Sequence, residues 1–148
     1  MCPNADIRAA TQLWESIVDQ AEMKVAVEQL YALSQAGDWD KVAEMVHDDL
    51  FITEAPGLPM EGVYRGKHAL RDLFTKVFGM LEITSVDFVD TTYGEDWAVA
   101  ILQMNFADGT SADLCEAFRF RDGKLAEIKP FYFDQAPVRA AAEASQKA

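Results

Sequence analysis

The C-terminal half of the sequence contains two Asp-Gly pairs, and each separates segments in which apolar and polar residues alternate. Asp108-Gly109 and Asp122-Gly123 are favoured in two-residue hairpin turns, and alternation with a period of two indicates strands with one buried face. The flanking segments are 97–106, 114–120 and 125–133. Strands joined by such short turns run antiparallel. This half of the chain therefore predicts neighbouring strands of an antiparallel sheet.

Helical periodicity dominates the first half of the chain. Apolar residues recur at steps of three and four over 6–36, with a shift that indicates a break near Met23. Gly37 then ends the helix, and Asp38 is a suitable N-cap for a short second helix. A third helix is predicted over 67–78, where the apolar residues again fall on one face.

Two more strands are predicted at 50–54 and 83–92, the first of them followed by a rigid proline-containing loop at 55–59. Helices that precede a run of strands are typical of an α+β domain, with the helices on one face of a curved sheet. The 148 residues suit a single domain with a core from about 6 to 135. The tail, 136–148, is rich in alanine and charge and forms either a short helix or no regular structure.

Charge and composition exclude several classes of protein. A formal net charge of -12, from 25 acidic and 13 basic residues, disfavours binding to nucleic acid or to an anionic membrane surface. No apolar run approaches the roughly 18 residues of a membrane span, and the first residues lack the pattern of a signal peptide. We therefore expect a cytoplasmic protein. Cys2 and Cys115 are expected to be free thiols, because two cysteines provide neither a disulfide framework nor metal-ligand spacing.

Glu116 is an unexpected residue in its strand, because it shares a face with Leu114 and Phe118. Burying an ionised, unpaired carboxylate is costly, so Glu116 should pair with a cation, keep its proton or border a cavity. A misjudged strand register is a further alternative. Arg65 is the better candidate for a salt bridge with a glutamate, since Arg119 alternates to the opposite face from Glu116.

A second carboxylate, Glu54, ends a predicted strand immediately before the proline-containing loop. Loops at strand ends often carry functional residues, because a rigid scaffold positions them. If the sheet wraps around the helices, Glu54 and Glu116 can face the same cavity. Apolar surroundings raise the pKa of a carboxyl group, and a second carboxylate nearby raises it further. One proton donor and one proton acceptor in a pocket are the minimum for general acid–base catalysis.

Several motifs together resemble the ketosteroid isomerase and SnoaL-like polyketide cyclase branch of the nuclear transport factor 2-like (NTF2-like) superfamily. They are Ala36-Gly37-Asp38, Asp48-Asp49, Glu54-Ala55-Pro56-Gly57, Gly66-Lys67-His68-Ala69-Leu70, Phe118-Arg119-Phe120 with Asp122-Gly123-Lys124, and Pro130-Phe131-Tyr132-Phe133-Asp134. The resemblance covers about residues 25 to 135. It implies a cone-shaped, cystatin-like α+β fold of about three helices packed on a strongly curved antiparallel sheet.

The resemblance also implies roles for individual residues. Glu54 falls at the position of the isomerase general base, and Glu116 at the position of its protonated oxyanion-hole carboxyl group. The oxyanion-hole tyrosine of the first helix aligns with Leu30, so Tyr31, one position later, is expected to point elsewhere. Tyr132 either supplies a hydroxyl group from another wall or packs in the core.

The resulting prediction is cofactor-free acid–base catalysis, either isomerisation or cyclisation next to a carbonyl group, on a small hydrophobic molecule. Epoxide opening by water in the same pocket and non-catalytic binding are the alternatives. No metal is expected, and the resemblance implies a homodimer formed through the outer face of the sheet. The predicted catalytic residues are Glu54, Glu116 and Tyr132. The predicted substrate-binding residues are Trp14, Phe51, Leu70, Phe74, Leu114, Phe118 and Ile128.

Overall fold

The computed structural model of the chain describes residues 19–147. In chain order its elements are α2 (Gln20–Ala36), α3 (Trp39–Met45), β1 (Val46–Glu54), β2 (Gly62–Arg65), α4 (Ala69–Met80), β3 (Ile83–Tyr93), β4 (Trp97–Phe106), β5 (Ser111–Arg121), β6 (Lys124–Tyr132) and α5 (Ala136–Lys147). The predicted α+β class is thus confirmed, and the tail forms a helix, α5. No helix in this part of the chain is long and apolar enough to cross a membrane.

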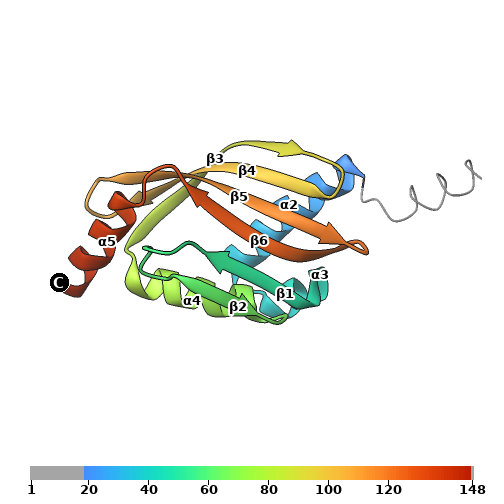
Figure 1. Cartoon of the computed structure of the whole chain (residues 1–148), viewed down its shortest axis with the longest axis horizontal. Helices are drawn as coiled ribbons and strands as arrows, with labels where there is room; N and C mark the ends of the chain where they lie inside the picture. The colour runs from blue at the N-terminus through green and yellow to red at the C-terminus, as the bar shows by residue number, and fades with distance from the viewer. Residues whose placement is uncertain (1–18, 148) are drawn as a thin grey trace, which may run out of the picture.

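The six strands form one sheet in the order β2-β1-β6-β5-β4-β3 (Figure 1). Every neighbouring pair is antiparallel except β1 and β6, which run parallel with Ile52 opposite Ile128. The sheet is therefore mixed, and it departs from the predicted antiparallel sheet at this one pair. The short turns that revealed the direction of the later strands have no counterpart between β1 and β6, which are far apart in the sequence.

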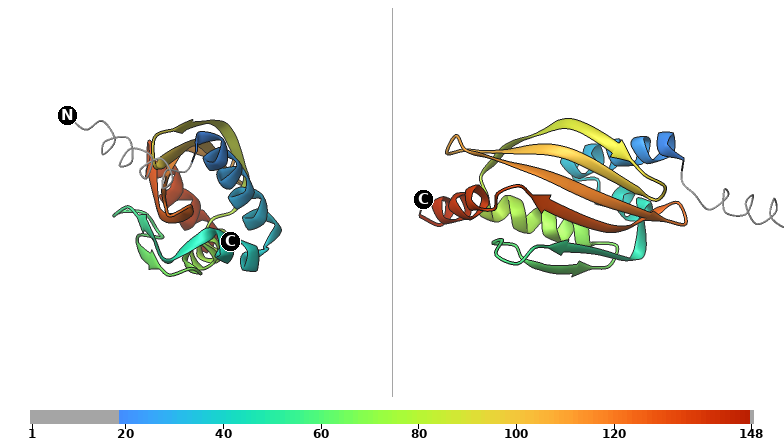
Figure 2. Two further views of the ribbon diagram at one scale, coloured as in Figure 1. Left: turned by 90° about the vertical axis from the view of Figure 1, so that its right-hand side faces the viewer. Right: turned by 45° about the horizontal axis from the view of Figure 1, so that its top comes forward.

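The sheet curls strongly, and α2 and α4 lie along its open side (Figure 2, left). On β4 the residues alternate between buried and partly exposed along the whole strand, as the sequence pattern predicted. The buried face of β4 points into the curl and packs in the hydrophobic core. Helix α2 contacts β3 and β4, whereas α4 contacts β1 and β2. This arrangement places the concave face of the sheet opposite two amphipathic helices.

The helix boundaries follow from local capping. Asp19 caps α2 together with Glu22, and the part of the predicted helix that precedes Asp19 lies outside the described residues. Gly37 ends α2 in the left-handed conformation (φ 71°), where its N–H reaches the carbonyl of Leu33. The Asp38 side chain accepts a hydrogen bond from the Lys41 N–H and begins α3, as predicted.

The two Asp-Gly pairs form different turns. Asp122 and Gly123 both have positive φ angles (53° and 76°), and together they make the predicted two-residue turn between β5 and β6. At Asp108-Gly109 the predicted two-residue turn was wrong, because the connection spans 107–110. The Asp108 carboxylate accepts hydrogen bonds from the backbone and hydroxyl groups of Thr110, and these bonds stabilise the longer loop.

Candidate functional site

A cavity of about 130 Å³ lies between the concave face of the sheet and helices α2 and α4. Its walls come from seven elements and are mostly apolar or aromatic. They comprise Leu30, Tyr31, Ser34, Gln35, Ile52, Glu54, Leu70, Leu73, Phe74, Val77, Phe78, Val86, Met104, Glu116, Phe118, Ile128, Pro130 and Tyr132. The structure thus brings Glu54, Glu116 and Tyr132, the three predicted catalytic residues, to one cavity.

Glu54 is the last residue of β1 and points to the same side as the buried Ile52. Its side chain is only 5% exposed. Oε2 has no hydrogen-bond partner among residues 19–147. Burial, and after it the negative charge of Glu116, raises the pKa of Glu54 to about 8.

Glu116 lies in the middle of β5, between Ala100 of β4 and Pro130 of β6. Neither neighbour has a long side chain, so both leave room on the concave face for the Glu116 carboxyl group and for the cavity beside it. Burial raises the pKa of Glu116 to about 7, and the nearby hydroxyl group of Tyr31 opposes this shift. At neutral pH the pair therefore keeps protons that free carboxyl groups would have lost, so one carboxyl group can act as an acid and the other as a base.

Tyr31 also lines the cavity, so the prediction that it points elsewhere was wrong. Leu30 and Tyr31 both face inward, because the curled sheet and α4 leave a cavity wide enough for neighbouring positions of α2 to border it. The Tyr31 ring makes edge-to-face contacts with Phe118 and Phe88, at centroid distances of 5.9 and 4.6 Å. Its buried hydroxyl group has no hydrogen-bond partner in the described part of the chain. Burial and the negative charge of nearby glutamates raise the pKa values of Tyr31 and Tyr132, so both remain proton donors.

The structure also places the predicted substrate-binding residues. The members that line the cavity are Leu70, Phe74, Phe118 and Ile128. Phe51 lies on the other face of β1, where the guanidinium group of Arg65 packs over its ring at 5.7 Å, so its predicted place in the wall was wrong. Leu114 is buried in the core opposite Tyr132 but does not reach the cavity wall. Trp14 lies outside the described residues.

Residues that the sequence analysis missed form the mouth of the cavity. Gln35 of α2 and Phe78 of α4 are both lining residues and exposed to solvent. Phe78 stacks on Phe74 with a centroid distance of 4.2 Å. Phe74 and Phe78 are four residues apart and therefore share one face of α4, and this spacing was the signal in the sequence that could have identified Phe78. Ser34, close by, already donates its hydroxyl hydrogen to the Leu30 carbonyl.

Neither arginine considered above forms a salt bridge with Glu54 or Glu116. Arg65 packs on Phe51, and Arg119 lies 3.7 Å from Asp96. The wall residues include no lysine, arginine or histidine. Within residues 19–147, no group of three or more histidine, cysteine, aspartate or glutamate side chains is arranged to hold a metal ion.

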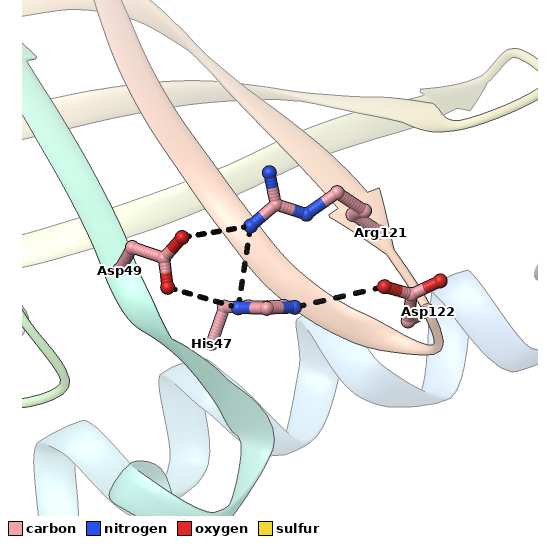
Figure 3. Close-up of polar contacts among 4 residues, drawn as sticks. All are labelled: His47, Asp49, Arg121 and Asp122. Carbon is pink, nitrogen blue, oxygen red and sulfur yellow. Dashed lines mark hydrogen bonds and ion pairs between the residues drawn. The ribbon is translucent and has the colours of Figure 1, made fainter.

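A separate polar cluster joins β1 to the turn between β5 and β6 (Figure 3), and none of its residues lines the cavity. His47 Nδ1 lies 3.3 Å from Asp49 Oδ1, and Arg121 Nη2 lies 3.2 Å from Asp49 Oδ2. His47 Nε2 lies 3.8 Å from Asp122. The hydrogen bond from His47, followed by that from Arg121, lowers the pKa of the exposed Asp49 carboxyl group. This cluster connects the first strand to the last hairpin and lies outside the candidate site.

The two raised pKa values make the stability of the protein dependent on pH. Glu54 and Glu116 bind protons more tightly in the folded state than at their ordinary value of 4.5. Their contribution to stability is therefore complete below about pH 4.5 and is lost as the pH rises through 7 and 8. We expect the urea midpoint to fall between about pH 5 and 9. Replacing both glutamates with glutamine should flatten this profile, and a midpoint that rises over the same range would contradict the assignment.

Comparison with known proteins identifies the family. The profile of the SnoaL-like domain matches residues 27–128, which is most of the chain. The chain belongs to the SnoaL-like domain family. The matched region begins in α2 and ends in β6, so it contains all the ionisable residues of the cavity except Tyr132. No curated protein sequence matches the chain significantly.

Solved structures show the same fold. An NTF2-like protein from Burkholderia xenovorans is 17% identical with a TM-score of 0.71, and the match covers 84% of this chain and 98% of that one. TerC, co-crystallised with polyporic acid, is 17% identical with a TM-score of 0.67, covering 82% and 98%. A protein from Sinorhizobium meliloti, assigned provisionally as a polyketide cyclase, is 15% identical with a TM-score of 0.62, covering 74% and 98%. At these identities the likeness establishes the NTF2-like fold of the SnoaL-like chain.

Proposed function

We propose that this SnoaL-like protein catalyses proton transfer next to a carbonyl group in a small hydrophobic molecule, using only its own side chains. The observation that carries the proposal is the pair Glu54 and Glu116, two carboxyl groups with raised pKa values in one largely apolar cavity. A pair that shares protons near neutral pH can donate a proton at one point of a substrate and accept one at another.

The surroundings of the two glutamates support different roles for them. Glu54 has an oxygen with no partner in the described part of the chain, as a base requires when it approaches a C–H bond. Glu116 lies beside Tyr31, so its side of the cavity offers two O–H donors when Glu116 is protonated. A substrate carbonyl oxygen that accepts these two hydrogen bonds favours the form in which Glu116 keeps its proton and Glu54 is ionised.

The reaction then proceeds through an enolate. The Glu54 carboxylate removes a proton from the carbon next to the carbonyl group, and the electron pair moves onto the carbonyl oxygen. Hydrogen bonds from Glu116 and Tyr31 stabilise this negative charge, which is a large source of catalysis in a site that excludes water. In an isomerisation, Glu54 returns its proton to a more distant carbon. In a cyclisation, the enolate carbon attacks a second carbonyl carbon of the substrate, the C=O π electrons move onto that oxygen, and the resulting alkoxide takes the proton from Glu54.

The size of the cavity limits the substrate. An apolar cavity of about 150 Å³ holds benzene, so the 130 Å³ here suits a single ring. A larger molecule has to extend towards solvent, where the exposed wall residues Gln35 and Phe78 lie. TerC, which has this fold, was co-crystallised with polyporic acid. We therefore propose monocyclic ketones and related enolisable carbonyl compounds as the first substrates to test.

The test uses 4-fluorophenol, a one-ring mimic of the enolate, with binding followed by ¹⁹F NMR. The phenol oxygen accepts hydrogen bonds from the protonated carboxyl group and from Tyr31. We expect its affinity to fall at least about tenfold between about pH 6 and 9, as the pair loses its last proton. Glu116→Gln should bind more weakly at low pH, because the carboxyl O–H that donates to the phenol oxygen is gone. No binding at any pH by the folded protein would overturn the proposal.

A further inference from the structure

A buried carboxyl group in the cavity wall has an oxygen that residues 19–147 leave without a hydrogen-bond partner. Glu54 is 5% exposed and lines the cavity, and its buried Oε2 has no donor among the described residues. An unpaired buried carboxylate oxygen is costly, so a ligand that donates a hydrogen bond to it gains the most from binding. Glu116 provides a second carboxyl group in the same cavity.

The remaining walls suit a cation. Among residues 19–147, five aromatic rings line the cavity, and no lysine, arginine or histidine side chain in the wall competes with a positively charged ligand. The aromatic residues are Tyr31, Phe74, Phe78, Phe118 and Tyr132. The face of an aromatic ring attracts an ammonium group, most strongly where water is excluded. A formal net charge of -12 also draws cations towards the protein from a distance.

From these features of the wall we propose that the cavity also binds small one-ring amines. The amine binds as an ammonium ion that donates hydrogen bonds to Glu54 and Glu116. The ammonium group supplies the donors that the Glu54 oxygen lacks. The ring of the ligand occupies the apolar part of the cavity, which has room for one ring. This binding does not depend on turnover and goes beyond the proposed proton transfer.

The charge of the carboxyl pair decides which ligand is favoured. The titratable groups that face the cavity are Tyr31 from α2, Glu54 from β1, Glu116 from β5 and Tyr132 from β6, whereas α4, β3 and β4 contribute only apolar side chains. The tyrosines stay neutral in the accessible range, so the glutamates alone change charge. An ammonium ion favours ionised carboxylates, and an enolate mimic requires a protonated one. The two ligands should therefore respond to pH in opposite directions.

The experiment compares three ligands that share one ring, 4-fluorobenzylamine, 4-fluorophenol and 4-fluorotoluene, by ¹⁹F NMR with the full chain. A primary ammonium group keeps its proton to about pH 9. We expect the affinity for the amine to rise at least about tenfold between about pH 6 and 8.5, while that for the phenol falls. The toluene derivative should bind weakly at every pH. Calorimetry in two buffers of different ionisation enthalpy should show that protons are released when the amine binds near pH 7.

Two variants and a control complete the test. Glu54→Gln and Glu116→Gln should each weaken amine binding at least about tenfold, since each removes a charge that the ammonium ion contacts. Glu28→Gln, on the exposed side of α2, should leave the affinity for the amine unchanged. An amine that binds no more tightly than 4-fluorotoluene, or without release of protons, would overturn the inference. Phenol binding that persists in that case would leave the proposed acid–base function standing.

Discussion

Replacing Glu54 with glutamine is expected to slow hydrogen exchange next to the carbonyl group of a bound monocyclic ketone by about 10² to 10⁴-fold. Glutamine keeps the size and most of the hydrogen-bonding capacity of the side chain but cannot accept the proton. The measurement is the rate at which a cyclic ketone exchanges its α-hydrogens with deuterium oxide, followed by NMR at saturating ketone. Because the ketone remains bound, the loss should appear in the turnover rate and not in the affinity.

The control for this experiment is Glu28→Gln, which removes one negative charge from the exposed surface of α2 and should exchange the ketone at the wild-type rate. Affinity of Glu54→Gln for 4-fluorophenol should be retained, because the hydrogen bonds to the phenol oxygen come from Glu116 and Tyr31. Unchanged exchange in Glu54→Gln would remove Glu54 from the role of base. If exchange were lost in Glu116→Gln but not in Glu54→Gln, the base would be Glu116.

The largest effect on stability is expected from Phe118→Ala, which should lower the free energy of unfolding by about 3 to 5 kcal/mol. Phe118 is 1% exposed, lies opposite Ala98 and Ile128 in the sheet and contacts the ring of Tyr31. Its removal enlarges a cavity that the surrounding strands cannot collapse to fill. The measurement is urea unfolding followed by circular dichroism, at about pH 6, where Glu54 and Glu116 are mostly protonated.

Phe133→Ala is the matched control, because Phe133 is 90% exposed just after β6 and should change the free energy of unfolding by less than about 0.5 kcal/mol. If Phe118→Ala lost less than about 1.5 kcal/mol, the aromatic wall of the cavity would not be part of the core, contrary to the packing described. The expected loss is a large part of the total for a domain of this size, since single domains are stable by only about 5 to 15 kcal/mol.

Local signals in the sequence were sufficient to predict most of the fold. The alternation in β4, the cap at Asp38, the left-handed Gly37 and the turn at Asp122-Gly123 each depend on residues close together in the chain. The parallel pairing of β1 and β6 was missed, because it depends on how distant segments meet. The composition of the tail did not decide between a short helix and no regular structure. In the structure the tail forms α5, and the Asp134 side chain accepts a hydrogen bond from the Ala136 N–H at the start of this helix.

In the candidate site, too, features that depend on local sequence could be predicted and features that depend on distant segments could not. Glu116 could be identified because a carboxylate on an apolar strand face is conspicuous in any fold. Tyr31 and Phe51 were placed wrongly for related reasons. The curl of the sheet decides how much of α2 borders the cavity, and the pairing of β1 with its neighbours decides which of its faces points inward. Neither property can be read from a short window of sequence.

The parallel pairing of β6 with β1 also has a consequence for how the protein is made. On one side of β6 lie β1 and β2, which carry Glu54, and on the other lie β5, β4 and β3, which carry Glu116. During synthesis the ribosome releases β6 last among the strands, so the two halves of the sheet stay unconnected until then. Pairing between segments so distant in the chain is slow to form. The strand that completes the sheet therefore also brings Glu54 and Glu116 to one cavity.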